Sequence, residues 1–392
     1  MNKIIFVIVF CLAVNIYSQT SRTGSSNVFL LPQGYGIKSL NSNGTSGIIN
    51  DVSNISALNP AAISQLVSYS FGLSYQFQTA IDEAWIAGIG TRRINCFLPQ
   101  SFGGVVKYEK FSLGLGMEQK YNGSQDLGPI PVTTAEYPDG TGEFITAQME
   151  RSILNFSLIG VYDFFNLISE NSTFSIGAKY NLNRFHNYEN LWNTHAEGSA
   201  FGSSWEIGTV YKFEYEKDKN CLLGISYSSA LEMSDKMKYS SDNELISVSD
   251  SSRLRSYYVI AELFIIRVKT PDELRFDLGI EPTKDIMLLM SIADVFWKTS
   301  AENIRNQIDL SSSITYSFNP TTTGSLGFYY TDYGYTVNYF DINGNMYALF
   351  ITTGISFNIN IVKVGLSLAD NHIYSGIFRE QTIGKISLDL TL

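Results

Sequence analysis

Apolar and polar positions alternate along much of this chain. The stretch VSYSFGLSYQFQ (67–78) carries a large apolar side chain at every second position, with Ser, Gly or Gln between them, and TFSIGAKYNLN (173–183) repeats this arrangement. Because successive side chains of a β-strand point to opposite faces of the sheet, this period predicts strands with one apolar face and one small polar face. The same alternation recurs in FSLGLGMEQ (111–119), SWEIGTVYKFEY (204–215), CLLGISYSSAL (221–231), VKVGLSL (362–368) and KISLDLTL (385–392).

Strand length separates a soluble β-sandwich, which also alternates, from a membrane barrel. Many of the alternating stretches are about twice as long as the ordinary strand of ~5–6 residues, and a tilted strand that crosses a membrane needs about 9–11. The second face is made of Ser, Gly, Asn and Gln, as expected for a barrel lumen. Aromatic residues near predicted strand ends resemble the interfacial girdles of membrane barrels. They are Trp205, Tyr211, Phe213, Tyr215 and Trp297.

The alternation predicts an all-β fold, an antiparallel transmembrane β-barrel of 14 strands. The least regular predicted strand is 256–280, where Pro271 interrupts the pattern. It is either one long kinked strand or two short ones, and two would make the number of barrel strands odd. The predicted strands are 67–78, 96–108, 111–121, 150–162, 173–184, 201–214, 220–232, 256–280, 285–297, 307–318, 323–332, 346–358, 361–370 and 383–392.

The connections between these strands alternate in length. Bacterial barrels have short periplasmic turns and longer outer loops, with both chain ends on the periplasmic side. The pattern therefore assigns the short gaps to the periplasmic end. The shorter gaps are Glu109–Lys110, 163–172, 215–219, 281–284, 319–322 and 359–360; the longer ones are 79–95, 122–149, 185–200, 233–255, 298–306, 333–345 and 371–382.

Composition supports a chain whose exterior does not face water alone. Aromatic residues make up 14% of the chain and charged residues only 16%, against about 25% charged in soluble proteins. The net charge of −10, without a basic patch, excludes a nucleic-acid partner. After the first 20 residues, no apolar run reaches the ~20 residues of a transmembrane helix.

The N-terminal region divides into a leader and a segment without strand pattern. Residues 1–19 have an early lysine, an apolar run and a polar end, which predicts a secretory signal peptide. Residues 20–66 are rich in Gly, Ser and Asn, and residues 67–392 carry the barrel strands. A barrel of this size leaks unless its lumen is filled, so we expect 20–66 to form a hatch, or plug, inside it. A periplasmic extension is the alternative. Cys96 and Cys221 lie in strand-like stretches, as two free thiols or one bridge.

The end of the hatch carries a compact motif. In SNISALNPAAISQL (53–66), Asn59 suits a helix cap and Pro60 the first helical position. With the preceding GYGIKSLNSNGTSGIINDV, this region resembles the hatch of the FadL family of outer-membrane transporters for long-chain fatty acids and other hydrophobic compounds. In that family an Asp and an Asn-Pro-Ala precede the first strand; the matching residues here are Asp51, Asn59, Pro60 and Ala61. The resemblance continues in FLPQSFGGVVKYEKFSLGLG (97–116), 203–231 and 270–298.

The resemblance implies a function and a location. FadL-like proteins bind a hydrophobic molecule in the barrel and release it sideways into the membrane through a kinked third strand. Here that strand is FSLGLGMEQKY (111–121), and Gly114 and Gly116 are its candidate gate residues, since strand glycines often mark bends. The same glycines also fit small lumen-facing positions. A fatty acid-like ligand, contact with outer-membrane lipid, a monomer and the Gram-negative outer membrane are all implied. Ligand-contacting residues match no motif.

A second function fits the same architecture. PorV-type barrels of the type IX secretion system share the Asn-Pro-Ala signature and attach secreted proteins at the cell surface, so a secreted protein is the alternative partner. The sequence has no HExxH zinc motif and no GxSxG nucleophile elbow. His186, His195 and His372 all fall in predicted outer loops. We therefore expect no catalytic residues, no metal and no cofactor, and a protein that is not an enzyme.

Overall fold

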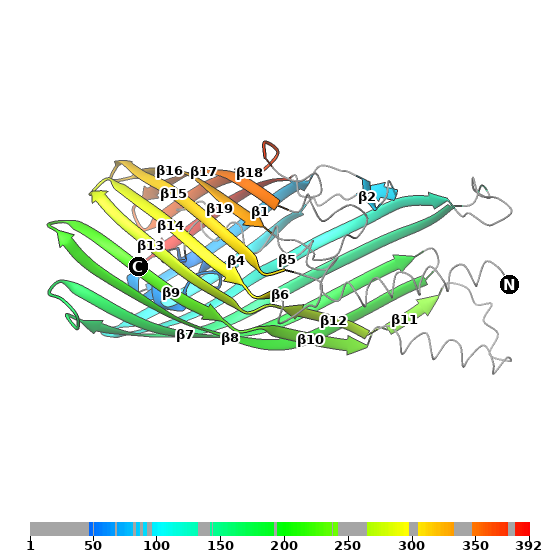
Figure 1. The fold of residues 1–392 in the computed structure, drawn as a ribbon, viewed down its shortest axis with the longest axis horizontal. Helices are drawn as coiled ribbons and strands as arrows, with labels where there is room; N and C mark the ends of the chain where they lie inside the picture. Colours follow the sequence, from blue (N-terminus) through cyan, green and yellow to red (C-terminus); the bar gives the residue numbers. More distant parts are fainter. Residues whose placement is uncertain are drawn as a thin grey trace.

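The computed structural model is a closed antiparallel β-barrel of 14 strands, as predicted (Figure 1). Consecutive wall strands pair with one another, and β19 closes the barrel on β1 through a register from Ser70↔Thr391 to Ala80↔Gln381. The structure describes residues 47–49, 51–66, 69–80, 84–86, 89–91, 96–131, 142, 144–191, 194–236, 238–241, 265–297, 305–332, 347–374 and 381–392. The predicted signal peptide, 1–19, and residues 20–46 of the predicted hatch lie outside this set.

The wall strands agree closely with the predicted ones at the end where the short turns lie. They are β1 (Tyr69–Ala80), β4 (Cys96–Tyr108), β5 (Phe111–Pro131), β6 (Phe144–Phe165), β7 (Ser172–Leu191), β8 (Thr194–Glu216), β9 (Lys219–Ser228), β13 (Glu273–Thr283), β14 (Ile286–Val295), β15 (Gln307–Asn319), β16 (Thr322–Asp332), β17 (Tyr347–Ile359), β18 (Val362–Asp370) and β19 (Gln381–Thr391).

Residues with positive φ close several of the short turns. Asn166, Asn171, Asp218 and Asn360 have φ between 55° and 61°, and Glu109 has φ 52°. Asn and Asp tolerate this left-handed region better than other non-glycine residues. The turn signals in the sequence therefore locate this end of the barrel accurately.

The long predicted strand 256–280 is split, without changing the number of wall strands. Among its described residues, β12 (Ile265–Thr270) and β13 are separated at Pro271–Asp272. β12 pairs with β10 (Leu231–Lys236), which follows β9, so the two form a separate ribbon beyond the β9–β13 pair. The further short strands are β2 (Ala84–Ile86), β3 (Ile89–Thr91) and β11 (Lys238–Ser241).

The outer ends of four strands run further than the alternation predicted. β5 to β8 continue well past the rim of their neighbours (Figure 1). His186 and His195 therefore lie on β7 and β8 and not in an outer loop, which corrects that expectation. The alternating pattern fades there because a strand above the hydrocarbon layer has no lipid-facing side to keep apolar.

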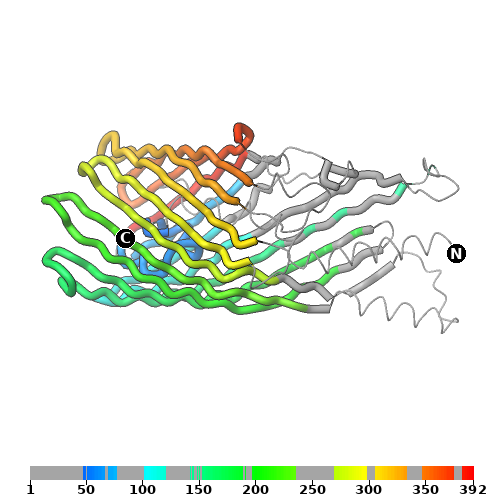
Figure 2. The backbone as a smooth tube through the Cα atoms, viewed as in Figure 1, coloured from blue at the N-terminus to red at the C-terminus, as the bar shows by residue number. Residues whose placement is uncertain are grey.

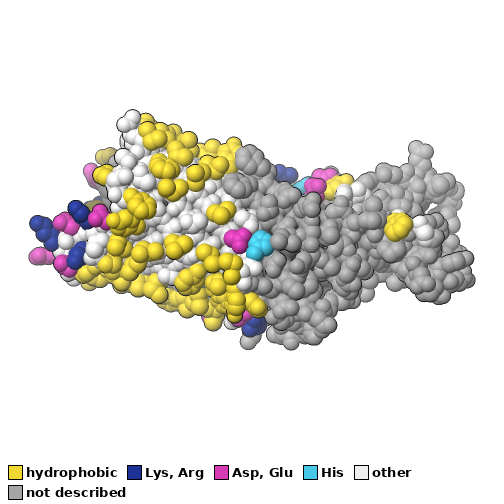
Figure 3. Space-filling view, turned by 90° about the horizontal axis from the view of Figure 1, so that it is seen from above, with side chains coloured by type: hydrophobic (Ala, Val, Ile, Leu, Met, Phe, Trp, Pro, Cys, Tyr) yellow, Lys and Arg dark blue, Asp and Glu magenta, His cyan; other side chains and the backbone are white. Residues whose placement is uncertain are grey.

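The outward faces of the strands form an apolar belt around the wall (Figure 3). Such a belt identifies a membrane-spanning barrel, because its strands satisfy their backbone hydrogen bonds by pairing and expose only apolar side chains. Exposed aliphatic members include Leu113, Leu115, Leu158, Ile207, Ile225, Ile292, Leu310, Leu326, Ile351 and Leu388. Exposed aromatic side chains near the short turns include Tyr108, Phe111, Phe165, Tyr215, Phe318 and Phe357.

Residues 47–49 and 51–66, here called the plug segment, lie inside the barrel (Figure 2). The segment contains two 3₁₀ helices, η1 (Val52–Asn54) and η2 (Pro60–Gln65). η1 contacts β1, β4 and β19, and η2 contacts β5 to β8, so the two helices together contact a continuous run of wall strands from β19 through β1 to β8. Among the described residues, no helix is long and apolar enough to cross a membrane.

Candidate functional site

Of the four predicted hatch residues, Asp51 and Asn59 are the N-caps of the two plug helices, and Pro60 and Ala61 are the first two residues of η2. Asp51 caps η1: its Oδ1 accepts hydrogen bonds from Ser53 N at 3.1 Å and Ser53 Oγ at 2.7 Å. Asn59 caps η2: its Oδ1 accepts from Ala61 N at 3.0 Å, and Pro60 stands at the first helical position. Caps of this kind satisfy backbone N–H groups that the first helical turn leaves unpaired. The motif thus fixes two short helices that are too short to be stable alone.

Asn59 also attaches the plug segment to the wall. Its Nδ2 donates to the carbonyl oxygens of Thr209 on β8 and Ile225 on β9, each at 3.2 Å. The side chain is buried, and both of its donor hydrogens and its acceptor oxygen have partners. A buried amide with all its hydrogen bonds made specifies one position for the segment that carries it. No alternative side chain of this size offers the same two donors and one acceptor.

Wall glycines make room for the plug backbone. A Cβ on Gly103 of β4 would lie 1.8 Å from the carbonyl oxygen of Val52, and one on Gly208 of β8 would lie 2.0 Å from Asn59 Oδ1. Neither space can hold any other residue without moving the plug. Inward glycines of three alternating stretches are likewise plug contacts, which explains their place on the lumen face. They are Gly72, Gly177 and Gly224.

Gly114 and Gly116, the candidate gate residues, also face the plug. A Cβ on Gly114 would lie 3.2 Å from Ile63 Cδ1, and one on Gly116 would lie 2.2 Å from Ser56 Oγ. The irregular part of β5 begins just beyond them. The register with β6 shifts between Gln119 and Tyr121 and again between Asp126 and Pro129.

The hydrogen-bonded ladder between β4 and β5 ends at Glu118, next to the first of these register shifts. It runs from Tyr108↔Phe111 to Ser101↔Glu118. Among the described residues beyond Glu118, β5 continues to pair with β6, and on its other side only Asp126 pairs, with Thr91 of β3. The wall therefore has an interrupted seam between its second and third strands, just above Gly116.

Lys179 binds the middle of the plug segment from β7. Its Nζ donates to the carbonyl oxygens of Ser56 at 2.9 Å and Leu58 at 2.8 Å, and forms an ion pair with Glu206 at 2.6 Å. Its side chain is only 1% exposed. The three N–H donors of the ammonium group match these three acceptors. A buried charge is tolerated only with such partners.

A second lysine secures the other end of η2. Lys107 Nζ on β4 donates to the Ser64 carbonyl oxygen at 2.6 Å and pairs with Asp163 of β6 at 3.1 Å. Ser175 Oγ of β7 bonds Asp163 at 2.7 Å and Ser64 Oγ at 3.0 Å. Apolar packing completes the attachment. That cluster is Val52, Ile55, Ile63, Leu66, Val105, Ile159 and Val161.

A chain of hydrogen bonds lines the wall beyond the plug. Trp297 Nε1 donates to Gln307 Oε1 at 2.9 Å, and Gln307 Nε2 donates to Asp309 Oδ1 at 2.6 Å. Tyr329 donates to Asp309 Oδ2 at 2.7 Å. Trp297 is 2% exposed, so its assignment to an interfacial girdle was wrong. Its indole N–H finds an internal partner, as a buried tryptophan requires.

Apolar side chains on the lumen face were missed from the sequence. Phe350 and Tyr329 pack with ring centroids 6.1 Å apart and are buried with Ala348, Ala369 and Ile383. We call these five residues the lumen patch. Alternation assigned the lumen a uniformly small polar face, and a single large apolar residue on it, such as Phe350 in YALFITT (347–353), was the available signal.

Candidate chemistry outside the lumen is sparse in the described part of the chain. Of the two cysteines predicted to be free or bridged, Cys221 is a free thiol. The side chain of Cys96 lies outside the described set. His372 Nδ1 lies 2.9 Å from Asp370 Oδ2 at the outer end of β18. No group of three or more His, Cys, Asp or Glu among the described residues is arranged to hold a metal ion.

The fold and the plug define a class, the membrane β-barrels whose lumen is occupied by their own N-terminal segment. Comparison with solved structures places this barrel among those of the FadL fold. A Pseudomonas aeruginosa FadL homologue aligns with a TM-score of 0.62 at 12% identity, over 92% of this chain and 99% of that one. No family model matches the sequence, and no curated protein matches it.

Two toluene transporters are similar to the same extent. TodX of P. putida aligns with a TM-score of 0.62 at 13% identity, and TbuX of Ralstonia pickettii with 0.60 at 12%. Each alignment covers 92% of this chain and 99% of the other. These neighbours are transporters and not enzymes. At such low identity the likeness establishes the fold.

Proposed function

We propose that this protein is an outer-membrane transporter for hydrophobic compounds, which bind in the lumen and leave sideways into the membrane. The observation that carries the proposal is the interrupted seam between β4 and β5, beside a lumen filled by the plug segment. The short turns then face the periplasm and the long β5–β8 wall faces the outside, as in other bacterial barrels.

The plug supports a lateral rather than an axial path. Lys179 and Asn59 hold the segment by buried hydrogen bonds to its backbone and to the wall. Removing it from the lumen would strip Lys179 of its two hydrogen bonds to the plug carbonyl oxygens, although the ion pair with Glu206 on the neighbouring wall strand would stay. Hydrogen bonds to a charged group contribute about 1.5–3 kcal/mol each. A diffusing apolar molecule brings no interaction that would replace them.

The seam supplies the alternative path. Backbone groups that face hydrocarbon without a partner are costly, so strands in a membrane wall separate only where something else compensates. β4 carries Pro99, which has no N–H to donate, just above the last paired residue, Ser101. Gly114 and Gly116 stand below the break on β5. We assign the lateral gate to the break just beyond the Ser101–Glu118 pair, with Gly114 and Gly116 on the paired part of the same strand below it.

The lumen patch supplies a binding surface. Tyr329 lies on the inner face of β16 and Phe350 on that of β17, and both side chains are buried. Binding pockets for small apolar molecules are lined mainly by such side chains with few polar groups. Long-chain fatty acids and monoaromatic hydrocarbons such as toluene both suit this surface, and they are the ligands we would test first.

Native mass spectrometry of the mature, detergent-purified protein tests the proposal, followed by organic extraction. We expect a bound apolar molecule that oleate or toluene displaces, and uptake of the same compound by cells that express the protein. A barrel that neither binds nor takes up either compound would refute the transporter. Co-purification of a secreted protein with such an empty barrel would favour the PorV-like attachment function instead.

A further inference from the structure

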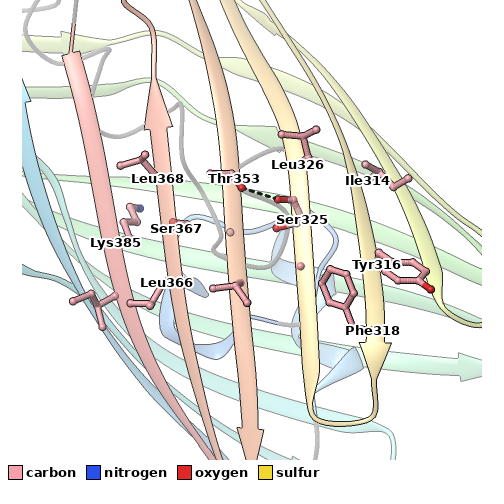
Figure 4. Close-up of a pocket in the computed structure, with 14 residues that line it drawn as sticks. Ile314, Tyr316, Phe318, Ser325, Leu326, Thr353, Leu366, Ser367, Leu368 and Lys385 are labelled. Atoms are coloured by element: carbon pink, nitrogen blue, oxygen red, sulfur yellow. Dashed lines mark hydrogen bonds between the residues drawn. The ribbon is translucent and has the colours of Figure 1, made fainter.

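An apolar groove lies on the outside of the barrel, across β15 to β19 and away from the β4–β5 seam (Figure 4). Its volume is about 710 Å³. Two neighbouring rows of outward residues form it. The strand registers place Ile314, Leu326, Thr353 and Leu368 in one row, and Tyr316, Gly324, Ile355, Leu366 and Ile386 in the next.

Small residues form the floor of this groove. Gly324 has no side chain, and Thr353 is the smallest side chain of its row. The Phe318 ring leans toward Gly324, since a Cβ there would lie 2.7 Å from its Cε2 atom. Tyr316 and Phe318 pack edge to face, with ring centroids 5.1 Å apart. They form one wall, and Leu366, Leu368 and Ile386 form the other.

The groove offers hydrocarbon contact and little else. Ser325, Ser367 and Lys385 also line it. The Thr353 hydroxyl donates to the Ser325 carbonyl oxygen at 3.3 Å. Thr353 therefore presents mainly its methyl group. Tyr316 stands toward the short-turn end of the groove and is 44% exposed. A tyrosine at this level suits the membrane interface, where its ring is apolar and its hydroxyl meets polar groups.

We propose that this groove holds one acyl chain of a phospholipid in the leaflet next to the short turns. The groove is part of the apolar belt, since its lining residues Leu326, Leu368 and Ile386 are exposed on the outer face, so its surroundings in a membrane are hydrocarbon. Between lipid and an apolar wall there is no hydrophobic driving force, and close packing decides what binds. An open trough lined mainly by apolar groups packs a single chain against its floor and both walls, where the convex wall packs it on one side.

This lipid site lies outside the lumen and is separate from the transport path. The order of the wall strands places β1 between β19 and the β4 side of the seam. An acyl chain in the groove is consequently not a substrate on its way out. It is a bound membrane lipid that fills the groove in the outer surface of the wall.

Photolabelling tests the site. The full protein is placed in nanodiscs with a phosphatidylethanolamine that carries a diazirine in its acyl chain, and labelled residues are mapped by mass spectrometry. We expect labelling concentrated on 314–326, 353–355 and 366–368, above the level of exposed belt residues on β5 such as Leu113 and Leu115. Thr353→Trp, which fills the groove with an apolar side chain, removes the excess.

Ser312→Trp is the matched control. Ser312 is a small outward residue on β15, one row beyond the groove, and does not line it. We expect it to leave the labelling pattern unchanged. Uniform labelling around the belt, or equal loss with both variants, overturns the proposal. So does cross-linking of the groove to a second copy of the chain. The wild-type pattern decides the matter even if Thr353→Trp fails to assemble.

Discussion

The side-chain oxygen of Asn59 occupies the space that a side chain at position 208 would need. An ideal Cβ on Gly208 would lie 2.0 Å from Asn59 Oδ1. The wall strand β8 therefore has a glycine because the plug has an asparagine. The same asparagine donates to the backbone of β8 and β9, so plug and wall are specified together.

Replacing Gly208 with alanine should loosen the plug. The new methyl group displaces the Asn59 amide, which loses hydrogen bonds to Thr209 and Ile225. We expect a stable barrel with frequent ion-conducting openings in planar bilayers, where the unmodified protein conducts little. Gly160→Ala is the control, because a Cβ at Gly160 meets nothing within 4 Å. Equal conductance in both variants would contradict the assigned role of Gly208.

Removing the Lys179 ammonium should destabilise the protein. Lys179→Met leaves Glu206 and two plug carbonyls without their buried partner. Loss of one member of a buried pair costs about 3–5 kcal/mol. We expect a clear fall in the urea concentration at which the barrel unfolds in detergent micelles. Unfolding is measured by gel electrophoresis, on which folded and unfolded barrels migrate differently.

Two further variants isolate this interaction. Lys219 pairs with Glu216 at 2.7 Å on the exposed surface, and surface pairs contribute little. Lys219→Met should therefore leave the unfolding midpoint unchanged. The double variant Lys179→Met with Glu206→Gln should recover part of the loss, because no buried charge then stays unpaired. A double variant less stable than Lys179→Met alone would argue against a direct ion pair.

The lumen patch should set ligand affinity. Phe350→Ala removes one of the two aromatic side chains of the patch and opens a cavity. We expect weaker binding of toluene and oleate by isothermal titration calorimetry, with a stability loss of about 3–5 kcal/mol typical of a buried Phe→Ala change. Phe328→Ala, on the lipid-facing side of β16, should keep ligand affinity. Weaker binding in Phe328→Ala alone would place the ligand elsewhere.

The period of the sequence predicted the barrel well and its outer rim poorly. Outward Phe71, Ile176 and Leu388 and inward Ser74 and Asn181 lie on the faces that alternation assigned them. Alternation is enforced only where one face meets hydrocarbon and the other the lumen. Above that layer β7 and β8 continue without it, which is why His186 was assigned to a loop.

The plug contacts could not be derived from one sequence. Asn59 is recognisable as a helix cap, yet its bonds to Thr209 and Ile225 join segments 150 and 166 residues apart. Gly116 reads equally as a bend and as a small lumen residue; its role depends on Ser56, which lies opposite only once the barrel closes. Trp297 ends a strand in the sequence, and its burial depends on Gln307 of the next strand.

The most direct test of lateral release is to lock the seam at its last residue pair. In a protein carrying Cys96→Ser and Cys221→Ser, Ser101→Cys and Glu118→Cys place thiols at directly paired positions of β4 and β5. Antiparallel partners lie about 4.5–5.5 Å apart at Cα, within reach of a disulfide. Asn155→Cys with Asn183→Cys, paired across the continuous β6–β7 ladder, is the control.

Uptake of radiolabelled oleate or toluene is then measured in cells before and after reduction. If the compound leaves between β4 and β5, the oxidised Ser101–Glu118 variant takes up no more than cells without the protein. Reduction restores uptake, and the β6–β7 control transports in both states. Full uptake by the oxidised seam variant would contradict lateral release and require a path past the plug.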